Sequence, residues 1–263
     1  MSPMTNNITL GGFLKVLLVS PNGFGKTRLY ASFPGPMYVF DFDNRMSTIR
    51  KDYPLRADIE FDSWNINNIE KFKTKLDGLT DSCPYATVVL DSITSLTTSL
   101  VLNSLGQTGG KILAKTNVPS FDEYVIETTL VTKLLEIFKI LNERKVCHTI
   151  VTAHPVERLS TSGTGKAMTI TKVRPIVTYG NKLSSIIPGY FDEVWAIQQL
   201  VGSDGQRQYI LQTRATEDDS AKTSLPLPDT MDITNQNVFE LLKKELAKSD
   251  IKLTETKPSV VTY

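Results

Sequence analysis

The sequence predicts an α/β fold in which a mostly parallel, twisted sheet is flanked by helices. Four short apolar runs rich in β-branched residues predict buried strands over residues 14–19, 37–42, 86–91 and 147–153. Continuous apolar strands of this length are typical of a parallel sheet covered on both faces. Between the third and fourth runs, apolar residues at helical spacing over 131–141 predict a helix packed on that sheet. Strands and helices in alternation indicate the α/β class.

The second half of the chain predicts an antiparallel addition to this sheet. Residues 192–198 and 207–213 flank a Gly-Ser-Asp-Gly turn, which is typical of a hairpin. A helical pattern around residues 238–246 closes the fold, and the polar, glycine-containing segments 103–117 and 156–185 predict loops. We expect one domain over 12–249, preceded by an N-terminal segment over 1–11 and followed by a polar tail over 250–263.

Composition excludes several classes of protein. The chain has 263 residues, of which 40% are hydrophobic and 22% charged, as in soluble globular proteins. Because 29 Lys and Arg nearly balance 28 Asp and Glu, any nucleic-acid affinity must come from a local patch. Two cysteines and two histidines exclude a disulfide framework and a multi-histidine metal site. No apolar run reaches the roughly 18 residues of a membrane span, so we expect a cytoplasmic protein without a membrane partner.

The segment S-P-N-G-F-G-K-T, directly after the first strand, predicts a phosphate-binding loop. Glycines in such a loop let consecutive backbone N–H groups point at phosphate oxygens. We expect the lysine to reach the β- and γ-phosphates of ATP and the threonine hydroxyl to bind Mg²⁺. The alternative is a chance Gly-Lys-Thr in an ordinary turn, and the pattern begins with serine where glycine is usual. The nucleotide-binding residues predicted here are Ser20, Pro21, Asn22, Gly23, Phe24, Gly25, Lys26 and Thr27.

Two further strands end in acids that suit a nucleotide site. Asp91 follows T-V-V-L and is the expected Mg²⁺ acid, although a strand-ending aspartate often caps a helix instead. Asp43 follows Y-V-F-D-F, and a carboxylate at this end of a parallel strand lies beside a bound nucleotide. Asp43 is therefore expected to orient or deprotonate the attacking water, the alternative being a residue that only turns the chain.

The order of these motifs resembles the RecA-core ATPases. The phosphate loop is followed by Y-V-F-D-F-D-N, T-V-V-L-D-S and T-I-V-T-A-H-P, and later by F-D-E-V-W-A-I and Y-I-L-Q-T-R-A. The chain is most similar, over about residues 12–230, to the small phage-encoded branch associated with single-strand annealing and recombination. This resemblance implies a RecA-like P-loop NTPase fold, Mg²⁺-dependent ATP hydrolysis and a homo-oligomeric ring or filament on single-stranded DNA. It also implies host cytoplasm as the location and a single-strand DNA-binding protein as a further partner.

The resemblance assigns roles to individual residues. The catalytic carboxylate of the RecA group maps onto Asp43, where many relatives have glutamate, and joins Lys26 and Asp91 as a catalytic residue. His154 falls where RecA-like proteins place a residue that senses the γ-phosphate; the alternative is a turn residue before a proline. Arg214 and Lys222 fall where RecA-type assemblies present cations to the neighbouring subunit's nucleotide, and a surface salt bridge is the alternative.

The segment 156–185 is the expected DNA-binding loop. It holds five basic residues against one acid, a net charge of +4. Under the resemblance its cations contact DNA phosphates and its tyrosine stacks on a base, although a solvated loop has the same composition. A P-loop ATPase that acts as a nucleotide switch or assembly factor without DNA is the alternative function. The expected DNA-binding residues are Lys166, Lys172, Arg174, Tyr179 and Lys182.

Overall fold

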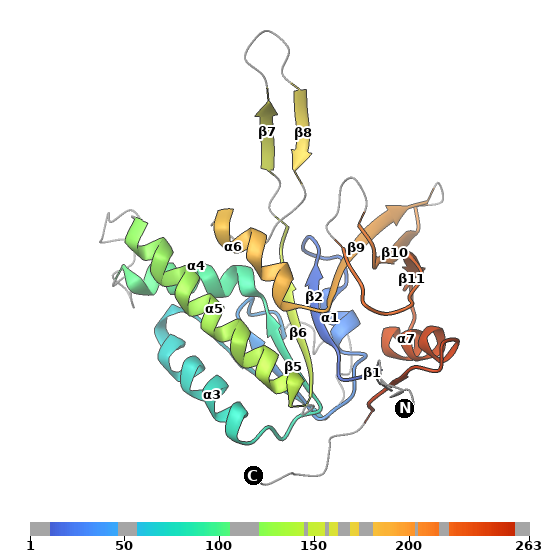
Figure 1. Ribbon diagram of the computed structural model, residues 1–263, viewed down its shortest axis with the longest axis horizontal. Helices are drawn as coiled ribbons and strands as arrows, with labels where there is room; N and C mark the ends of the chain where they lie inside the picture. Colours follow the sequence, from blue (N-terminus) through green and yellow to red (C-terminus); the bar gives the residue numbers. More distant parts are fainter. Residues whose placement is uncertain are drawn as a thin grey trace, which may run out of the picture.

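The fold is built on one eight-stranded sheet with helices on both faces (Figure 1). The strand order is β11-β10-β9-β2-β6-β5-β3-β4. The computed structural model describes residues 11–46, 57–105, 121–144, 147–155, 158–162, 169–173, 181–202, 205–215 and 221–255.

Six neighbouring strands of the sheet run parallel. They are β2 (Lys15–Val19), β3 (Met37–Asp41), β4 (Ile59–Ser63), β5 (Thr87–Asp91), β6 (His148–Ala153) and β9 (Glu193–Val201). The four strands predicted from apolar runs are β2, β3, β5 and β6, and every residue in them is buried. The predicted hairpin is also present, because β10 (Arg207–Gln212) runs antiparallel to β9. A short strand, β11 (Thr230–Asp232), pairs antiparallel with β10.

Helices cover the two faces of the sheet. One face carries η1 (Ile66–Asn68), α3 (Ile69–Asp81), α4 (Ile93–Ser104), α5 (Phe121–Glu143), α6 (Asn181–Ile186) and η3 (Ile187–Tyr190). The other face carries α1 (Lys26–Tyr30) and α7 (Val238–Ala247). Ser and Asn side chains cap α4 and α7: Ser92 accepts the N–H of Ser95 at the start of α4, and Asn237 accepts that of Glu240 in α7.

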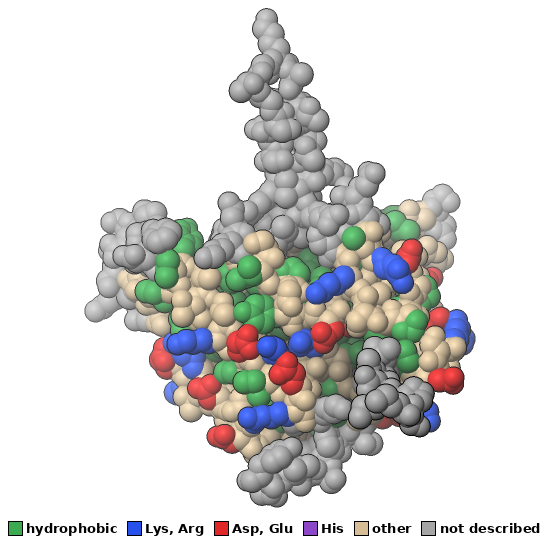
Figure 2. Space-filling model, viewed as in Figure 1, with side chains coloured by type: hydrophobic (Ala, Val, Ile, Leu, Met, Phe, Trp, Pro, Cys, Tyr) green, Lys and Arg blue, Asp and Glu red, His purple; other side chains and the backbone are tan. Residues whose placement is uncertain are grey.

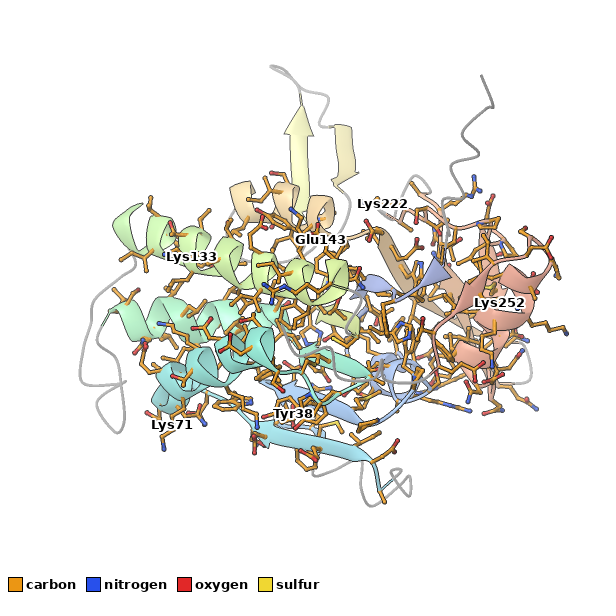
Figure 3. All side chains as sticks on the ribbon, turned by 60° about the horizontal axis from the view of Figure 1, so that its bottom comes forward. Tyr38, Lys71, Lys133, Glu143, Lys222 and Lys252 are labelled. Carbon is orange, nitrogen blue, oxygen red and sulfur yellow. The ribbon has the colours of Figure 1, made fainter. Side chains whose placement is uncertain are left out.

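Alternate residues of the central strands feed two apolar cores. In β2, Leu17 and Val19 face the core under α3, α4 and α5, whereas Val16 and Leu18 face the core under α1 and α7. Side chains fill the layer between the helices and the sheet (Figure 3). Burial on both faces is what the continuous apolar runs predicted. Within the described ranges, none of the helices combines the length and apolarity that a membrane crossing needs.

Two segments differ from the sequence-based expectation. The predicted loop 156–185 contains β7 (Arg158–Ser162) and β8 (Thr169–Val173), an antiparallel ribbon that follows β6, and it also contains the start of α6. The β-branched run T-I-T-K-V suits a strand, a signal that the polarity of the segment concealed. Of the predicted loop 103–117, residues 103–104 end α4 and residues 106–117 lie outside the described ranges.

The structure also differs from the expectation for segments 1–11 and 250–263. β1 (Gly11–Gly12) pairs in parallel with β12 (Lys252–Leu253), and Ile251 and Leu253 are buried. The first residues of the segment predicted as a polar tail therefore contribute to the core. Cys147 and His148, directly before and at the first position of β6, are both fully buried.

Candidate active site

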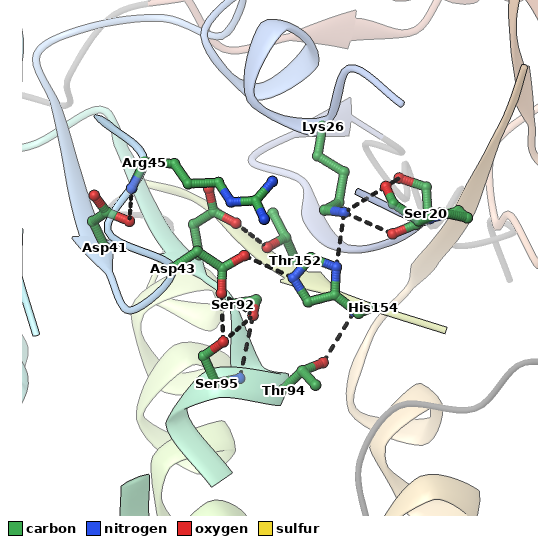
Figure 4. Close-up of polar contacts among 12 residues, drawn as sticks. Ser20, Lys26, Asp41, Asp43, Arg45, Ser92, Thr94, Ser95, Thr152 and His154 are labelled. Atoms are coloured by element: carbon green, nitrogen blue, oxygen red, sulfur yellow. Dashed lines mark hydrogen bonds and ion pairs between the residues drawn. The ribbon is translucent and has the colours of Figure 1, made fainter. Parts of the chain in front are cut away.

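The chemically active residues predicted from the sequence meet at the carboxyl ends of the parallel strands (Figure 4). β6 lies between β2, which leads into the phosphate loop, and β5, which ends in Asp91. The end of β6 can therefore contact both. Ser20 donates its backbone N–H to the carbonyl of Ala153 (3.2 Å), which fixes the start of the phosphate loop against β6. The structure brings Lys26, Asp43 and His154 together at this edge.

The phosphate loop turns on its two glycines. Gly23 and Gly25 have φ angles of 81° and 89°, a left-handed conformation that residues with a Cβ rarely adopt. After this turn, the Lys26 ammonium donates to the carbonyl oxygens of Ser20 (2.6 Å) and Pro21 (3.0 Å). Burial lowers the pKa of Lys26 to about 8, although the carboxylates of Asp91 and Asp43 act to raise it. The loop therefore holds a buried ammonium beside two acids.

Asp91 is buried and hydrogen-bonded through both carboxylate oxygens. Its Oδ1 accepts from the Thr152 hydroxyl (2.5 Å) and its Oδ2 from the Tyr30 hydroxyl (2.9 Å). Burial raises the pKa of Asp91, and these two hydrogen bonds act in the opposite direction. The cap of the following helix is Ser92, so the helix-capping alternative for Asp91 is wrong. The carboxylate instead faces the phosphate-loop helix.

Thr27 and Asp91 offer a donor set that fits Mg²⁺. The Tyr30 hydroxyl donates to the Asp91 carboxylate (2.9 Å), and Thr27 stands one turn before Tyr30 in the same helix, so α1 carries the threonine on the element that contacts Asp91. Mg²⁺ prefers hard oxygen ligands and is usually held by one or two protein groups plus phosphates and water. In the described part of the chain, no group of three or more His, Cys, Asp or Glu side chains could hold a metal by itself. This arrangement fits a Mg²⁺ ion that arrives with a nucleotide.

Asp43 accepts three side-chain hydrogen bonds. Its Oδ1 accepts from the hydroxyls of Ser92 (2.8 Å) and Ser95 (2.5 Å), and its Oδ2 bonds Nε2 of His154 (2.7 Å). Burial alone would raise the pKa of Asp43, but the bonds from His154 and the two serines hold it well below the usual range. The carboxylate that shapes the turn after β3 is Asp41, which accepts the backbone N–H groups of residues 45 and 46.

His154 links Asp43 to the phosphate loop. Its Nε2 faces the Asp43 carboxylate, and its Nδ1 lies 3.2 Å from the Lys26 ammonium. An ionised carboxylate only accepts hydrogen bonds and an ammonium only donates them. We therefore assign the neutral ring with its proton on Nε2. The backbone N–H of His154 donates to the Thr94 hydroxyl (3.0 Å), which fixes the residue directly after β6.

A family model described as an AAA domain matches residues 13–225. The chain belongs to this AAA domain family. The matched range contains the phosphate loop, both strand-end acids and His154. A P-loop ATPase of the AAA type binds and hydrolyses nucleotides, in agreement with the geometry of this edge. No curated protein matches the sequence.

Several contributors to the AAA domain's site were not predicted from sequence. Tyr30 and Thr152 hold Asp91, while Ser95 and Thr94 hold Asp43 and His154. The one available signal is spacing, since Thr152 stands two residues before His154 and shares its side of the strand. Thr94 and Ser95 come from the first turn of α4, and nothing in the sequence connects that turn to Asp43 or His154.

The remaining predicted residues lie apart from this cluster or outside the described ranges. Arg214 forms an exposed ion pair with Asp229 (Nε to Oδ1, 3.0 Å), which is the alternative stated for it. Lys222 is exposed and bridges Val194 through the backbone (Figure 3). The structure does not describe the DNA-binding candidates Lys166, Arg174 and Tyr179, nor the side chains of Lys172 in β8 and Lys182 in α6.

Proposed function

We propose that this AAA domain is a RecA-like, Mg²⁺-dependent ATPase that acts on single-stranded DNA in phage-type recombination, annealing or repair. The observation that carries the ATPase part is the convergence of Lys26, Asp91 and the Asp43–His154 pair at one sheet edge. The DNA part is supported by the motif order and by the charge of the segment that follows His154.

The phosphate loop and Asp91 bind and neutralise the nucleotide. Backbone N–H groups of the loop and the Lys26 ammonium contact the phosphates, and Lys26 neutralises charge that develops on the terminal phosphoryl group. Thr27 and Asp91 hold Mg²⁺, which supplies further neutralisation of the phosphates. Loss of one such fixed charge typically lowers the rate about 10²- to 10³-fold.

The Asp43–His154 pair activates the attacking water. It lies on the side of Lys26 that faces the ends of β3 and β6, and both members are bonded to elements of the sheet or α4. A base fixed in this way removes a proton from water without first having to be ordered.

The DNA site is proposed for segment 156–185. On the face shown in Figure 2, the described basic and acidic side chains are interspersed. By contrast, segment 156–185 carries a net charge of +4 and begins two residues after His154. The ribbon β7–β8 within it continues from β6, beyond the edge that carries the nucleotide residues (Figure 1). Binding of DNA phosphates there would act on His154 through the chain that joins β6 to this segment.

Phosphate release from ATP with and without single-stranded DNA tests this function. We expect DNA to accelerate hydrolysis, and the acceleration to disappear as salt rises. Replacing Lys166, Lys172, Arg174 and Lys182 with alanine should leave basal hydrolysis intact and abolish the stimulation. The log–log salt dependence of binding should flatten by about 0.7 for each DNA phosphate that the variant no longer binds. Changing Tyr179 to alanine should weaken binding without altering that slope, because stacking releases no counterions.

A matched control removes the same number of charges elsewhere. Lys71, Lys133, Lys244 and Lys252 are exposed on α3, α5, α7 and β12, and their alanine variants should keep the stimulation. Unchanged DNA affinity and slope in the variant of segment 156–185 would instead favour an ATPase that acts as a nucleotide switch or assembly factor.

A further inference from the structure

The carboxylate predicted as the general base has little capacity left to accept a proton. Asp43 receives two hydroxyl donors on Oδ1 and an imidazole donor on Oδ2, and its side chain is only 6% exposed. A carboxylate that accepts several hydrogen bonds is stabilised in its charged form and is a weak base. The lowered pKa of Asp43 agrees with this geometry.

His154 has the opposite properties. Its side chain is 18% exposed, three times the value for Asp43, and Nδ1 carries the lone pair of the neutral ring. The partner of Nδ1 is the Lys26 ammonium at 3.2 Å, the longest of the three bonds that this ammonium makes. Lys26 is also the group that the proposed function assigns to the phosphates. Nδ1 therefore points at the position where the nucleotide's terminal phosphate meets the protein.

We propose that Nδ1 of His154 is the general base for the attacking water and that Asp43 is a positioning residue, an inference that rests on the proposed ATPase function. As the water oxygen bonds to the terminal phosphorus, its proton passes to Nδ1. The bond from that phosphorus to the bridging oxygen breaks, and its electron pair stays on the departing diphosphate. The imidazolium keeps its Nε2–H on Asp43, whose negative charge stabilises it, and then returns the proton to solvent.

The groups facing His154 fix the expected pH response. Asp43, in the turn after β3, and Lys26 of α1 are the charged groups in contact with the ring. Asp91 at the end of β5 and Arg45 interact electrostatically with Lys26. A rate that needs a neutral imidazole falls as the pH decreases within the range of about 5 to 8. A rate that needs the Asp43 carboxylate as base falls only below about pH 4.

Single-turnover hydrolysis of ATP, measured from about pH 5 to pH 9, distinguishes the two bases. We expect the rate of the wild type to fall toward low pH as a single group takes up a proton. His154→Gln should lose this pH dependence together with about 10²-fold or more of the rate. Asp43→Asn should keep the loss of rate toward low pH, because His154 remains the proton acceptor. His148→Gln, at the other end of β6, is the matched control and should keep the pH dependence of the wild type.

Chemical rescue separates a proton acceptor from a structural residue. Free imidazole added to His154→Gly should restore hydrolysis, with a rescue that grows as imidazole becomes neutral. Retention of ATP binding by His154→Gln shows that the variant is folded. The inference is overturned if His154→Gln keeps the wild-type rate and pH dependence while Lys26→Ala is inactive, a result that leaves the ATPase function standing. Wild-type turnover by Lys26→Ala would instead overturn the ATPase function itself.

Discussion

The two histidines of the chain stand at opposite ends of β6, and their surroundings differ in kind. His148, at the start of the strand, is fully buried; its Nδ1 accepts the backbone N–H of Leu14 (3.0 Å) and its Nε2 bonds the carbonyl of Thr254 (2.8 Å). Three phenylalanine rings, Phe13, Phe33 and Phe239, pack around it at centroid distances of 5.1–5.6 Å. Both nitrogens of His148 are therefore committed to backbone groups.

His154 contacts side chains that carry charge. Its partners Asp43 and Lys26 can exchange hydrogen bonds with a ligand, whereas the backbone partners of His148 are part of the fold. Residue type alone therefore does not distinguish a reactive histidine from a structural one. The difference lies in the hydrogen-bond partners: those of His148 are backbone groups of the fold, whereas those of His154 are charged side chains that can also bond a ligand. At the amino end of β6, His148 joins the backbone at Leu14 and Thr254 to the sheet. At the carboxyl end, His154 joins Asp43 to Lys26 of the phosphate loop.

The largest effect that sharpens this comparison is expected for Asp91. Asp91→Asn removes the negative charge that would hold Mg²⁺ and should lower Mg²⁺-dependent turnover by about 10²-fold or more. The check is a Mg²⁺ titration of phosphate release, with Asp77→Asn, an exposed acid of α3, as control. An unchanged Mg²⁺ titration would give Asp91 a structural role only and would contradict the assignment of a catalytic site to this edge of the sheet.

A second change tests the other end of the strand. His148→Ala leaves a cavity among three rings and two unpaired backbone groups, so the free energy of unfolding should fall by about 3 kcal/mol. His154→Ala, near the surface, should cost about 1 kcal/mol or less. Urea denaturation measures both values. Equal losses for the two variants would contradict the division between a structural and a reactive histidine.

The pH dependence of stability provides a smaller, graded signal. Burial lowers the pKa of His148 from 6.5 to about 4. Between these two pH values the unfolded chain binds a proton that the folded chain does not bind. The stabilising contribution is complete above pH 6.5 and is lost as the pH falls toward 4, at about 1.4 kcal/mol per pH unit. Wild type minus His148→Gln, measured by urea denaturation at a series of pH values, should show this slope.

The smallest effect on stability is expected away from both ends. Arg214→Ala breaks an exposed ion pair with Asp229 and should change the free energy of unfolding by less than about 1 kcal/mol. If Arg214 acts on a neighbouring subunit's nucleotide, the pure variant should nonetheless be inactive. Mixing it with Lys26→Ala subunits should then restore some hydrolysis, and the absence of rescue would assign Arg214 to its own subunit.

The sequence was sufficient to predict the strands that carry continuous apolar runs and the loop whose glycines need positive φ angles. These signals are local. A run of apolar residues, or Gly23 and Gly25 before Lys26, can be recognised in the sequence without knowing which distant residues they contact. β4 was not predicted, since only one of its five residues is buried and its pattern is that of a polar segment.

The contacts within the site could not be predicted in the same way. Ser95 and Asp43 are 52 positions apart, and Tyr30 and Asp91 are 61 apart. No periodicity links such pairs; they meet because β2, β6, β5 and β3 follow one another in the sheet. Asp43 was predicted as the base from its place in a motif, but only its three donors reveal how weakly it would accept a proton.

The central claim is that the carboxyl end of β6 serves catalysis and not stability, and Lys26→Met tests it most directly. Methionine fills a similar volume without the ammonium, whose charge is disfavoured by burial, the cause that lowers the pKa of Lys26 to about 8. We therefore predict that phosphate release from Mg²⁺–ATP falls by about 10²-fold or more, while the free energy of unfolding stays equal or rises. Wild-type phosphate release by Lys26→Met would contradict the account.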